Sequence, residues 1–392
     1  MRPAAPALVL AMLAGPALAQ VEQGPPNAPY EPAFASQTRA PALPATAVQA
    51  QPFSGPLDNA WGIASLPDGT FLVTEKPGRL RLMAADGTLS DPIAGVPEVD
   101  PRGQGGLLDV AASPGFAEDR TVFLTYAKPM GRDRVATAAA RGTLSADGTE
   151  LTDVRDIFVQ DPWSYSPAHY GSRVVPLPDG TLAVTTGDHS DESERYRAQE
   201  PGDTWGKVVR LTPNGEALSD NPFAQGGGSP LVWTTGHRNL QGAALDAQGR
   251  LWVSEMGPLG GDELNLIEPG TNYGWPEVSY GLNYDGSPVG DGMPRAEGFA
   301  EPAYYWDPVI APGGMDFYGG DLFPEWRGDL LIGGLKNGEL VRLSLDGDRV
   351  AGEERLLTGV GRVRDVEELP DGSLLLLIDA EDAPILRVTP AG

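Results

Sequence analysis

A short turn that recurs along the chain is the feature that most restricts its fold. In each copy a polar turn containing glycine, the residue that most readily adopts a positive φ, is followed by a β-prone run. Four close copies and two looser ones are LPDGTFLVTE (66–75), LPDGTLAVTTGD (177–188), LDAQGRLWVSEM (245–256), LPDGSLLLLIDA (369–380), SPGFAEDRTVFLTYA (113–127) and FPEWRGDLLIGGL (323–335). Six copies of one strand–turn–strand unit predict six repeated β-sheets.

The distance between copies indicates the size of each sheet. Successive turns lie about 43 to 80 residues apart, and several are followed by a second shared strand such as GRLRLMAADG or ELVRLSLDGD. This interval accommodates about four strands with variable loops. The sequence therefore predicts an all-β fold, a six-bladed β-propeller of four-stranded antiparallel blades, whose ligand-binding residues are scattered along the chain. Two β-sandwiches are the alternative, disfavoured because no linker-like composition interrupts residues 55–392.

The start of the chain is typical of an exported protein. Residues 1–19 combine Arg2, an apolar run and a small-residue site at Ala17-Leu18-Ala19, the pattern of a signal peptide too short to span a bilayer. Residues 20–51, rich in Pro and Ala, are expected to be a loosely attached leader, and residues 52–392 the propeller. We expect a periplasmic or secreted protein with no membrane insertion.

The composition excludes several classes of function. The absence of cysteine excludes disulfides and thiolate metal sites, and three histidines disfavour a three-histidine centre. A net charge of −26 argues against nucleic acid or an anionic membrane as partner, and is compatible with oxygen-rich binding of Ca²⁺. The chain lacks G-x-S-x-G, H-E-x-x-H and a nicotinamide-binding G-x-G-x-x-G.

Cations nevertheless gather in the expected loops. Arg238 and Asn239 stand in GHRNLQG, Lys336 in GGLKNGEL, and Arg362 and Arg364 in GRVRDV. The last two are spaced to face the same side of a strand. Four cations around a ring indicate a small polyanionic ligand. The alternative is that each is paired with one of the plentiful Asp and Glu residues.

Oxygen ligands without His or Cys gather in SEMGPLGGDELNLIEPGTNYGWP. Gly257 and Pro258 fix an irregular turn whose carbonyls are free to point at a ligand, and Asp262 and Glu263 supply carboxylates. Tyr273 lies in a glycine-bounded turn. This set suits Ca²⁺ without forming an EF-hand loop.

Two further positions are candidates for the site. His169 stands in AHYGSR, directly before one of the close repeats, although a lone histidine near a sheet is more often structural than catalytic. Gln104, in GQGGLLDV, lies among glycines that allow the backbone to approach a ligand. His189 and His237 are interpreted as structural or peripheral.

Taken in order, these motifs resemble the soluble PQQ-dependent sugar dehydrogenases (the glucose/sorbosone dehydrogenase family), and specifically their aldose sugar dehydrogenase branch. The resemblance covers about residues 55–390. The motifs that carry it are GQGGLLDVAASPGF, HYGSR…LPDGTLAVTTGD, GHRNLQG, SEMGPLGGDELNLI…NYGWP, W…APGGMDFY, LKNGELVRL and RVRDV. Each is weak alone, whereas their shared order is specific.

The resemblance implies a six-bladed propeller that binds pyrroloquinoline quinone (PQQ), an ortho-quinone with three carboxylates, together with Ca²⁺. The cofactor-binding residues it implies are Gln104, Arg238, Asn239, Tyr284, Trp306, Lys336, Arg362 and Arg364. It also implies that Gly257 and Pro258 bind calcium through their carbonyls. Glu263 and Tyr273 would form a further calcium site, with Asp262 beside it.

The resemblance further implies a reaction in which His169 is the general base. It would take the proton of the anomeric hydroxyl of a mono- or disaccharide aldose while hydride passes to the quinone, giving a lactone. An external acceptor, a cytochrome or a quinone, would reoxidise the cofactor in a monomer or homodimer. Ala168 stands where the longer glucose dehydrogenase branch has Asp, so the partner that orients His169 must come from elsewhere.

Two other functions fit a six-bladed propeller. A calcium-dependent lactonase would need an axial cage of acidic and asparagine ligands, and would not need three arginines and a lysine. A non-catalytic propeller that binds carbohydrate or protein is not excluded by the fold, because one fold hosts many functions.

Overall fold

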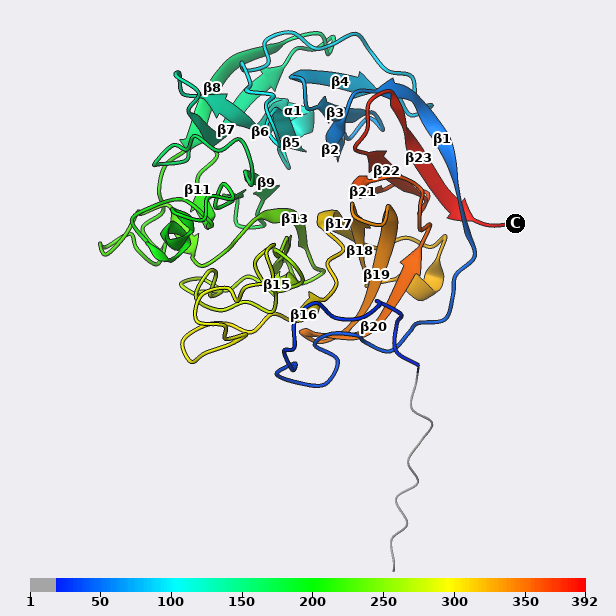
Figure 1. The fold of residues 1–392 in the computed structure, drawn as a ribbon. Coiled ribbons are helices and arrows are strands. Elements are labelled where there is room, and N and C mark those ends of the chain that lie inside the picture. Colours follow the sequence, from blue (N-terminus) through cyan, green and yellow to red (C-terminus); the bar gives the residue numbers. More distant parts are fainter. Residues whose placement is uncertain (1–18) are drawn as a thin grey trace, which may run out of the picture.

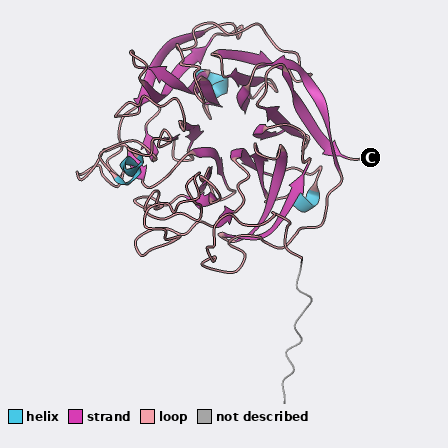
Figure 2. Ribbon diagram, viewed as in Figure 1, coloured by secondary structure: helices cyan, strands magenta, loops and turns pink. Residues whose placement is uncertain are grey.

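In the computed structural model, residues 19–392 form a closed ring of six antiparallel sheets around a central axis (Figure 1). The expected signal peptide, apart from Ala19, lies outside the described residues. Strands make up nearly all the regular structure (Figure 2), and the helical segments are α1 (Phe116–Asp119), η1 (Arg195–Gln199) and η2 (Pro324–Trp326). Within residues 19–392, no helix is long and apolar enough to cross a membrane. The predicted six-bladed propeller is confirmed.

Each sheet is one blade, numbered along the chain and beginning with the strand nearest the axis. Blade one contains β2 (Ala60–Ser65), β3 (Phe71–Glu75) and β4 (Arg79–Met83); blade two contains β5 (Leu107–Ala112), β6 (Thr121–Pro129), β7 (Val135–Leu144) and β8 (Leu151–Val159). Blade three contains β9 (Gly171–Pro176), β10 (Leu182–Thr186), β11 (Val208–Leu211) and β12 (Val232–Thr234); blade four contains β13 (Leu240–Leu245), β14 (Leu251–Glu255), β15 (Asp262–Leu266) and β16 (Tyr304–Trp306). Blade five contains β17 (Pro312–Phe317), β18 (Leu330–Gly334), β19 (Glu339–Asp346) and β20 (Arg349–Leu356); blade six contains β21 (Val363–Glu368), β22 (Leu374–Ile378), β23 (Ala383–Pro390) and β1 (Val48–Leu57). Every recurring turn connects the first and second strands of a blade.

Blade one differs from the predicted four strands. In the described chain it has three. The next segment pairs with β4 only irregularly, through a bridge between Met83 and Leu89 and backbone hydrogen bonds from Ser90 to Leu82 and from Ile93 to Leu80. Pro92, Pro97 and Pro101 follow, and proline supplies no N–H to a strand ladder. The composition of this segment therefore explains the missing strand.

The two ends of the chain together close the ring. β1 pairs antiparallel with β23 as the outermost strand of blade six, from Val48 opposite Pro390 to Leu57 opposite Ala383. Pairing the first strand with the last leaves no open gap between blades one and six. The expected start of the propeller at residue 52 falls inside β1.

The segment expected to be a loosely attached leader is packed against the propeller. Residues 20–47 run along the outside of blades four and five (Figure 1), and Ala28, Gln37 and Ala40 are buried there. Hydrogen bonds join this segment to β16 and β20. Its attachment is largely polar and lacks hydrophobic periodicity, which is why the composition did not predict it.

In every blade, the segment before the first strand and the turn after the second strand lie at the same end of the ring, because neighbouring strands in a blade are antiparallel. Apolar side chains such as Leu80, Leu124 and Ala138 fill the space between neighbouring blades and hold the sheets in place. The loops at that end of all six blades surround the axis.

Candidate active site

A cavity of about 260 Å³ lies where these loops meet the axis. Its walls come from all six blades, as the scattered motifs predicted. The lining residues are Trp61, Lys76, Gly103, Gln104, Leu108, Tyr170, Gln241, Met256, Ala311, Arg362, Arg364 and Asp379. The predicted residues Gln104, Arg362 and Arg364 are therefore brought together in one cavity.

His169 lies beside this cavity, immediately before the inner strand of blade three. Its side chain is buried, its backbone N–H donates to the Oε1 of Gln104 at 2.8 Å, and its φ of 44° is in the left-handed region. Its Nδ1 lies 2.7 Å from the Oδ1 of Asp188. Asp188 thus supplies the orienting contact that Ala168 does not.

Asp188 is itself held in place on both sides. Its Oδ1 accepts a hydrogen bond from the backbone N–H of Ser190 at 2.8 Å, and its Oδ2 accepts one from the Nε1 of Trp275 at 2.8 Å. Burial works to raise the pKa of this carboxyl, but the neighbouring His169 and Arg238 lower it below its ordinary value. A carboxylate fixed in this way holds the tautomer that carries hydrogen on Nδ1, leaving the Nε2 of His169 as the proton acceptor.

The surroundings of His169 favour its neutral form. Burial, followed by the positive charge of Arg238, lowers the pKa of the imidazole below 6.5, while Asp188 acts in the opposite direction. A neutral imidazole with one free nitrogen is able to remove a proton.

Three cations face one carboxylate at the opposite wall of the cavity. Arg364 donates to the Oδ2 of Asp379 at 2.8 Å and to the Oε1 of Gln241 at 2.6 Å, and Arg362 reaches Asp379 at 3.4 Å. Lys76 lines the same wall. Burial and the nearby Arg362 lower the pKa of Arg364, and burial lowers that of Lys76. Even so, three cations against one carboxylate give this wall a net positive charge.

An unsatisfied donor indicates what this wall is able to bind. The Nε of Arg364 is buried and has no hydrogen-bond partner among residues 19–392. A buried donor without an acceptor is costly, so a ligand acceptor at this position would be stabilising. Together with the excess of cations, this fits a ligand with several carboxylates.

Arg238 and Asn239 connect the cavity with the turn at 257–261. Arg238 donates to the carbonyl oxygens of Met256 and Gly257 at 2.8 and 2.7 Å. The Oδ1 of Asn239 accepts from the N–H of Gly171 at 3.1 Å. The Gly257 carbonyl expected to bind calcium thus already accepts a guanidinium N–H, although a carbonyl oxygen has a second lone pair.

Asp262 supports the same turn from behind. Its Oδ1 accepts from the N–H of Gly257 at 2.8 Å, and its Oδ2 accepts from Ile310 and Ala311, each at 2.7 Å. Burial raises its pKa to about 7. All its contacts are to backbone N–H groups, so Asp262 shapes the loops around the site.

A second acidic position lies next to this turn. Glu263 and Glu255 are paired across β15 and β14, and Asn265 donates to both at 3.1 Å. Burial, followed by the charge of Glu255, raises the pKa of Glu263. The two carboxylates border a small hollow together with Gly257, Pro258 and Tyr273. Such a set of oxygen donors fits a hard cation, which would relieve the repulsion between the carboxylates.

The hydroxyl of Tyr273 is hydrogen-bonded to the backbone, and its ring packs on a histidine. The hydroxyl donates to the carbonyl of Leu266 at 2.6 Å and accepts from the N–H of Glu268 at 3.0 Å. The ring stacks on His237 at a centroid distance of 4.6 Å. His237 in turn contacts Glu255 at 2.9 Å, consistent with its interpretation as structural.

Trp306, Lys336 and Tyr284, which were predicted to bind the cofactor, lie away from the cavity wall. Trp306 is fully buried on the outermost strand of blade four, where its Nε1 donates to Glu353 of blade five at 3.2 Å. A side chain without solvent contact on an outer strand is not placed to touch an axial ligand. Lys336 is exposed after β18, outside the cavity lining. Tyr284 is 68 % exposed, and its hydroxyl accepts from Arg238 at 3.3 Å at the rim.

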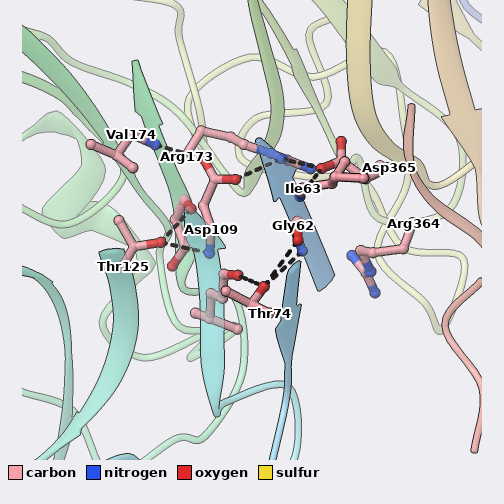
Figure 3. A network of polar contacts seen from close by, with 12 residues as sticks. Gly62, Ile63, Thr74, Asp109, Thr125, Arg173, Val174, Arg364 and Asp365 are labelled. Atoms are coloured by element: carbon pink, nitrogen blue, oxygen red, sulfur yellow. Dashed lines mark hydrogen bonds and ion pairs between the residues drawn. The ribbon is translucent and has the colours of Figure 1, made fainter. Parts of the chain in front are cut away.

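A buried ionic cluster joins the inner strands of several blades near the cavity (Figure 3). The Nη1 of Arg173 donates to Asp109 at 2.9 Å and to Asp365 at 3.0 Å, and its Nε donates to the carbonyl of Gln241 at 2.7 Å. Its guanidinium lies 4.5 Å from the centre of the Trp61 ring. These contacts join the inner strands of blades one, two, three, four and six.

Sequence reasoning missed Lys76, Asp188, Gln241 and Asp379. Three of them share a position that the repeat defines, because Lys76, Asp188 and Asp379 directly or almost directly follow the second strand of their blades. Aligning the six repeats and inspecting the residues after each LPDG strand would have identified them. Gln241 lies within β13 and carries no comparable signal.

Comparison with known proteins agrees with this arrangement. A protein-family model described as Glucose / Sorbosone dehydrogenase matches residues 57–387. Aldose sugar dehydrogenase YliI of Escherichia coli is 40% identical over 354 residues, which cover 89% of this chain and 94% of the relative.

Two solved structures have the same fold. The soluble aldose sugar dehydrogenase from Escherichia coli in its apo form is 39% identical, with a TM-score of 0.84 over 88% of this chain and 100% of that one. The PQQ-bound aldose sugar dehydrogenase from Streptomyces coelicolor is 29% identical, with a TM-score of 0.73 over 88% of this chain and 99% of that one. The chain is therefore an enzyme of the glucose/sorbosone dehydrogenase family, within the quinoprotein sugar dehydrogenases that its motifs resemble.

Proposed function

We propose that this enzyme oxidises the C1 hydroxyl of aldose sugars to lactones with PQQ and Ca²⁺, using His169 as general base. The observation that carries the proposal is the His169–Asp188 pair, 2.7 Å apart, beside a cavity whose wall is cationic. When bound, PQQ would accept the hydride from C1, and calcium would withdraw electron density from its quinone oxygens. Both the sugar and the cofactor would come from solution to the axial end of the ring.

The chain's own residues perform three tasks in this mechanism. The Nε2 of His169 takes the proton of the C1 hydroxyl, and Asp188 stabilises the imidazolium that forms. Arg362, Arg364 and Lys76 attract the carboxylates of the cofactor, and Arg238 and Asn239 border it from blade four. The carbonyls of Gly257 and Pro258 would contribute to a calcium site, and Glu263 with the backbone of Tyr273 to another.

A lactonase is less well supported. It would need acidic and asparagine ligands around the axis, whereas the described cavity lining has Lys76, Arg362 and Arg364 against the single carboxylate of Asp379. In residues 19–392 no group of three or more His, Cys, Asp or Glu side chains is arranged to hold a metal. A calcium site here therefore relies on backbone carbonyls as well as carboxylates.

The proposed activity is tested by reconstitution. Purified protein is treated with PQQ and Ca²⁺ and assayed for dye reduction with a panel of mono- and disaccharide aldoses, with PQQ alone and Ca²⁺ alone as controls. We expect dye reduction that depends on both additions and on the sugar. Failure of every sugar, with no quinone absorbance retained after desalting, would exclude the proposal. A lactonase would instead hydrolyse lactones without PQQ, and a binding protein would retain sugar without turnover.

The physiological context is also proposed. The pattern of residues 1–19 supports export to the periplasm or outside the cell, which N-terminal sequencing of the mature protein tests by showing whether it starts at Gln20. The net charge of −26 supports a basic external electron acceptor such as a cytochrome. Electron transfer to such an acceptor should slow as ionic strength rises, and a rate independent of salt would argue against it.

A further inference from the structure

Residues 20–47, the N-terminal strap, lie outside the residues matched by the family model and make an extensive contact with blades four and five. Near its start, Gln23 donates to the hydroxyl of Tyr304 at 3.2 Å and to Glu353 at 3.0 Å. Further along, the fully buried Gln37 accepts the backbone N–H of Tyr305 with its carbonyl at 2.8 Å. The strap thus covers the outer strand of blade four (blue segment beside β16 in Figure 1).

The middle of the strap binds one buried carboxylate. Asp307, directly after β16, accepts hydrogen bonds from the backbone N–H of Asn27 at 2.9 and 3.0 Å and from that of Ala28 at 2.8 Å. The side-chain amide of Asn27 donates to the same carboxylate at 2.7 Å. Arg39, also in the strap, donates to the carbonyl of Asp307 at 2.8 Å. A buried carboxylate is tolerated only when it is hydrogen-bonded in this way.

The other face of this carboxylate supports the turn at 257–261. Gly260 has a φ of +84°, and a Cβ added there would come within 2.6 Å of the Oδ1 of Asp307. Next to it, the N–H of Gly261 donates to the carbonyl of Trp306 at 2.9 Å. The turn therefore rests directly on Trp306 and Asp307, with no side chain between them.

The chain of contacts runs from the strap through Asp307 to the turn whose Gly257 and Pro258 carbonyls are the proposed calcium ligands. Asp262 holds the start of this turn through the N–H of Gly257. The carbonyl of Trp306 holds its end through the N–H of Gly261, and the carboxylate of Asp307 packs against Gly260. Groups that orient metal ligands from behind commonly change metal affinity about 10–100-fold when they are removed. Displacing the strap would leave Asp307 free to move away from Gly260.

We propose that the N-terminal strap, through Asn27 and Asp307, is a positioning element that holds the 257–261 turn in its calcium-binding conformation. This inference rests on the proposed calcium dependence of the enzyme. It differs from a purely structural role, in which the strap would protect the edge of blade four without affecting the affinity for the cation.

The test measures calcium affinity separately from stability. Calcium is titrated calorimetrically into chelator-treated, PQQ-free protein, in a Glu263→Gln background that removes the other candidate calcium ligand. Thermal unfolding of the same proteins is followed in EDTA. The variants are Asp307→Ala, the milder Asn27→Ala, which removes one of the hydrogen bonds to Asp307, and Gln23→Ala as the matched control. Gln23 is also an amide of the strap, but its contacts are to Tyr304 and Glu353.

We expect Asp307→Ala to weaken calcium binding at least about tenfold and Asn27→Ala a few-fold. Gln23→Ala should lower the unfolding temperature in EDTA while leaving the calcium dissociation constant unchanged. If Asp307→Ala does not fold, Asn27→Ala decides alone. If the Asn27 and Asp307 variants bind calcium as tightly as the parent protein but unfold at lower temperatures, the inference is overturned and the proposed function is left intact. A parent protein that binds no calcium either without PQQ or with PQQ added would overturn both.

Discussion

The carboxylate of Asp188 lies 2.7 Å from the Nδ1 of His169, although the two residues are 19 positions apart in the chain. His169 precedes the first strand of blade three and Asp188 follows the second, so the antiparallel pairing of β9 with β10 brings them together. The fold of one blade thus produces a histidine with an oriented ring and one free nitrogen.

Replacing Asp188 tests this relationship. In Asp188→Asn the partner of Nδ1 no longer carries the charge that stabilises imidazolium, so we expect kcat to fall roughly 100-fold or more. PQQ retention, measured by absorbance after desalting, should be unchanged. Trp275→Phe removes only the indole donor to Asp188 and should have a much smaller effect. If kcat falls equally in Asp188→Asn and Trp275→Phe, the cause is a general disturbance of the site and not the loss of the charge on Asp188.

The pH dependence of kcat/KM follows from the environment of His169. The base must be neutral, and burial with Arg238 lowers its pKa below 6.5, so activity should fall on the acid side with a midpoint below 6.5. Asp188 works to raise this pKa, so the midpoint in Asp188→Asn should move to still lower pH. Activity rising through a midpoint above 7 would contradict this assignment.

Removal of Arg364 should weaken cofactor binding. This guanidinium is buried at the cavity wall, and its loss leaves a trianionic ligand facing Asp379 with one fewer cation. We expect the PQQ dissociation constant of Arg364→Met to rise about tenfold or more, measured by fluorescence quenching. The matched control is Arg387→Met on the outer part of blade six, where Arg387 pairs with Asp371. If Arg364→Met binds PQQ as tightly as the control Arg387→Met does, Arg364 has no role in PQQ binding.

Arg173 should be important for stability. In Arg173→Met the buried carboxylates of Asp109 and Asp365 lose their shared cation, at a cost of about 3–5 kcal/mol in the free energy of unfolding. Burial already raises the pKa of Asp109 to about 6, above its unfolded value, so as the pH falls the folded protein takes up a proton here more readily than the unfolded chain. The stability difference between Arg173→Met and the wild type should therefore become smaller as the pH falls from 7 to 5. Urea unfolding at both pH values measures the free energy of unfolding of Arg173→Met relative to the wild type. The double variant Arg173→Met/Asp109→Asn, which removes one of the uncompensated carboxylates, should recover part of the lost stability. A double variant as unstable as Arg173→Met would contradict this account.

The fold was predictable because its information is local and repeated. Each LPDG-type turn forces a strand reversal wherever it occurs, and six copies specify six blades without knowledge of distant contacts. The strap was misjudged for the opposite reason. Its stability comes from contacts with residues far along the chain, such as Asn27 with Asp307, and its own composition carries no periodic signal.

The candidate site was predictable where residues occur in motifs and not where they depend on register. Arg362 directly precedes β21 and Arg364 lies within it, and both reach Asp379, in agreement with the predicted convergence of the two cations. Trp306 was expected near the cofactor, but its place on the outermost strand of blade four could be known only from the strand order. The role of Asp188 depends on the pairing within blade three, which the sequence of either segment alone does not contain.

The most direct test of the central claim is single-turnover reduction of the bound cofactor. Wild-type protein and His169→Gln are loaded with PQQ and Ca²⁺, mixed with excess aldose without an external acceptor, and followed by the absorbance change of the quinone. We predict that both proteins retain the cofactor, and that reduction in His169→Gln is at least about 100-fold slower. Reduction at the wild-type rate in His169→Gln would show that His169 is not the base.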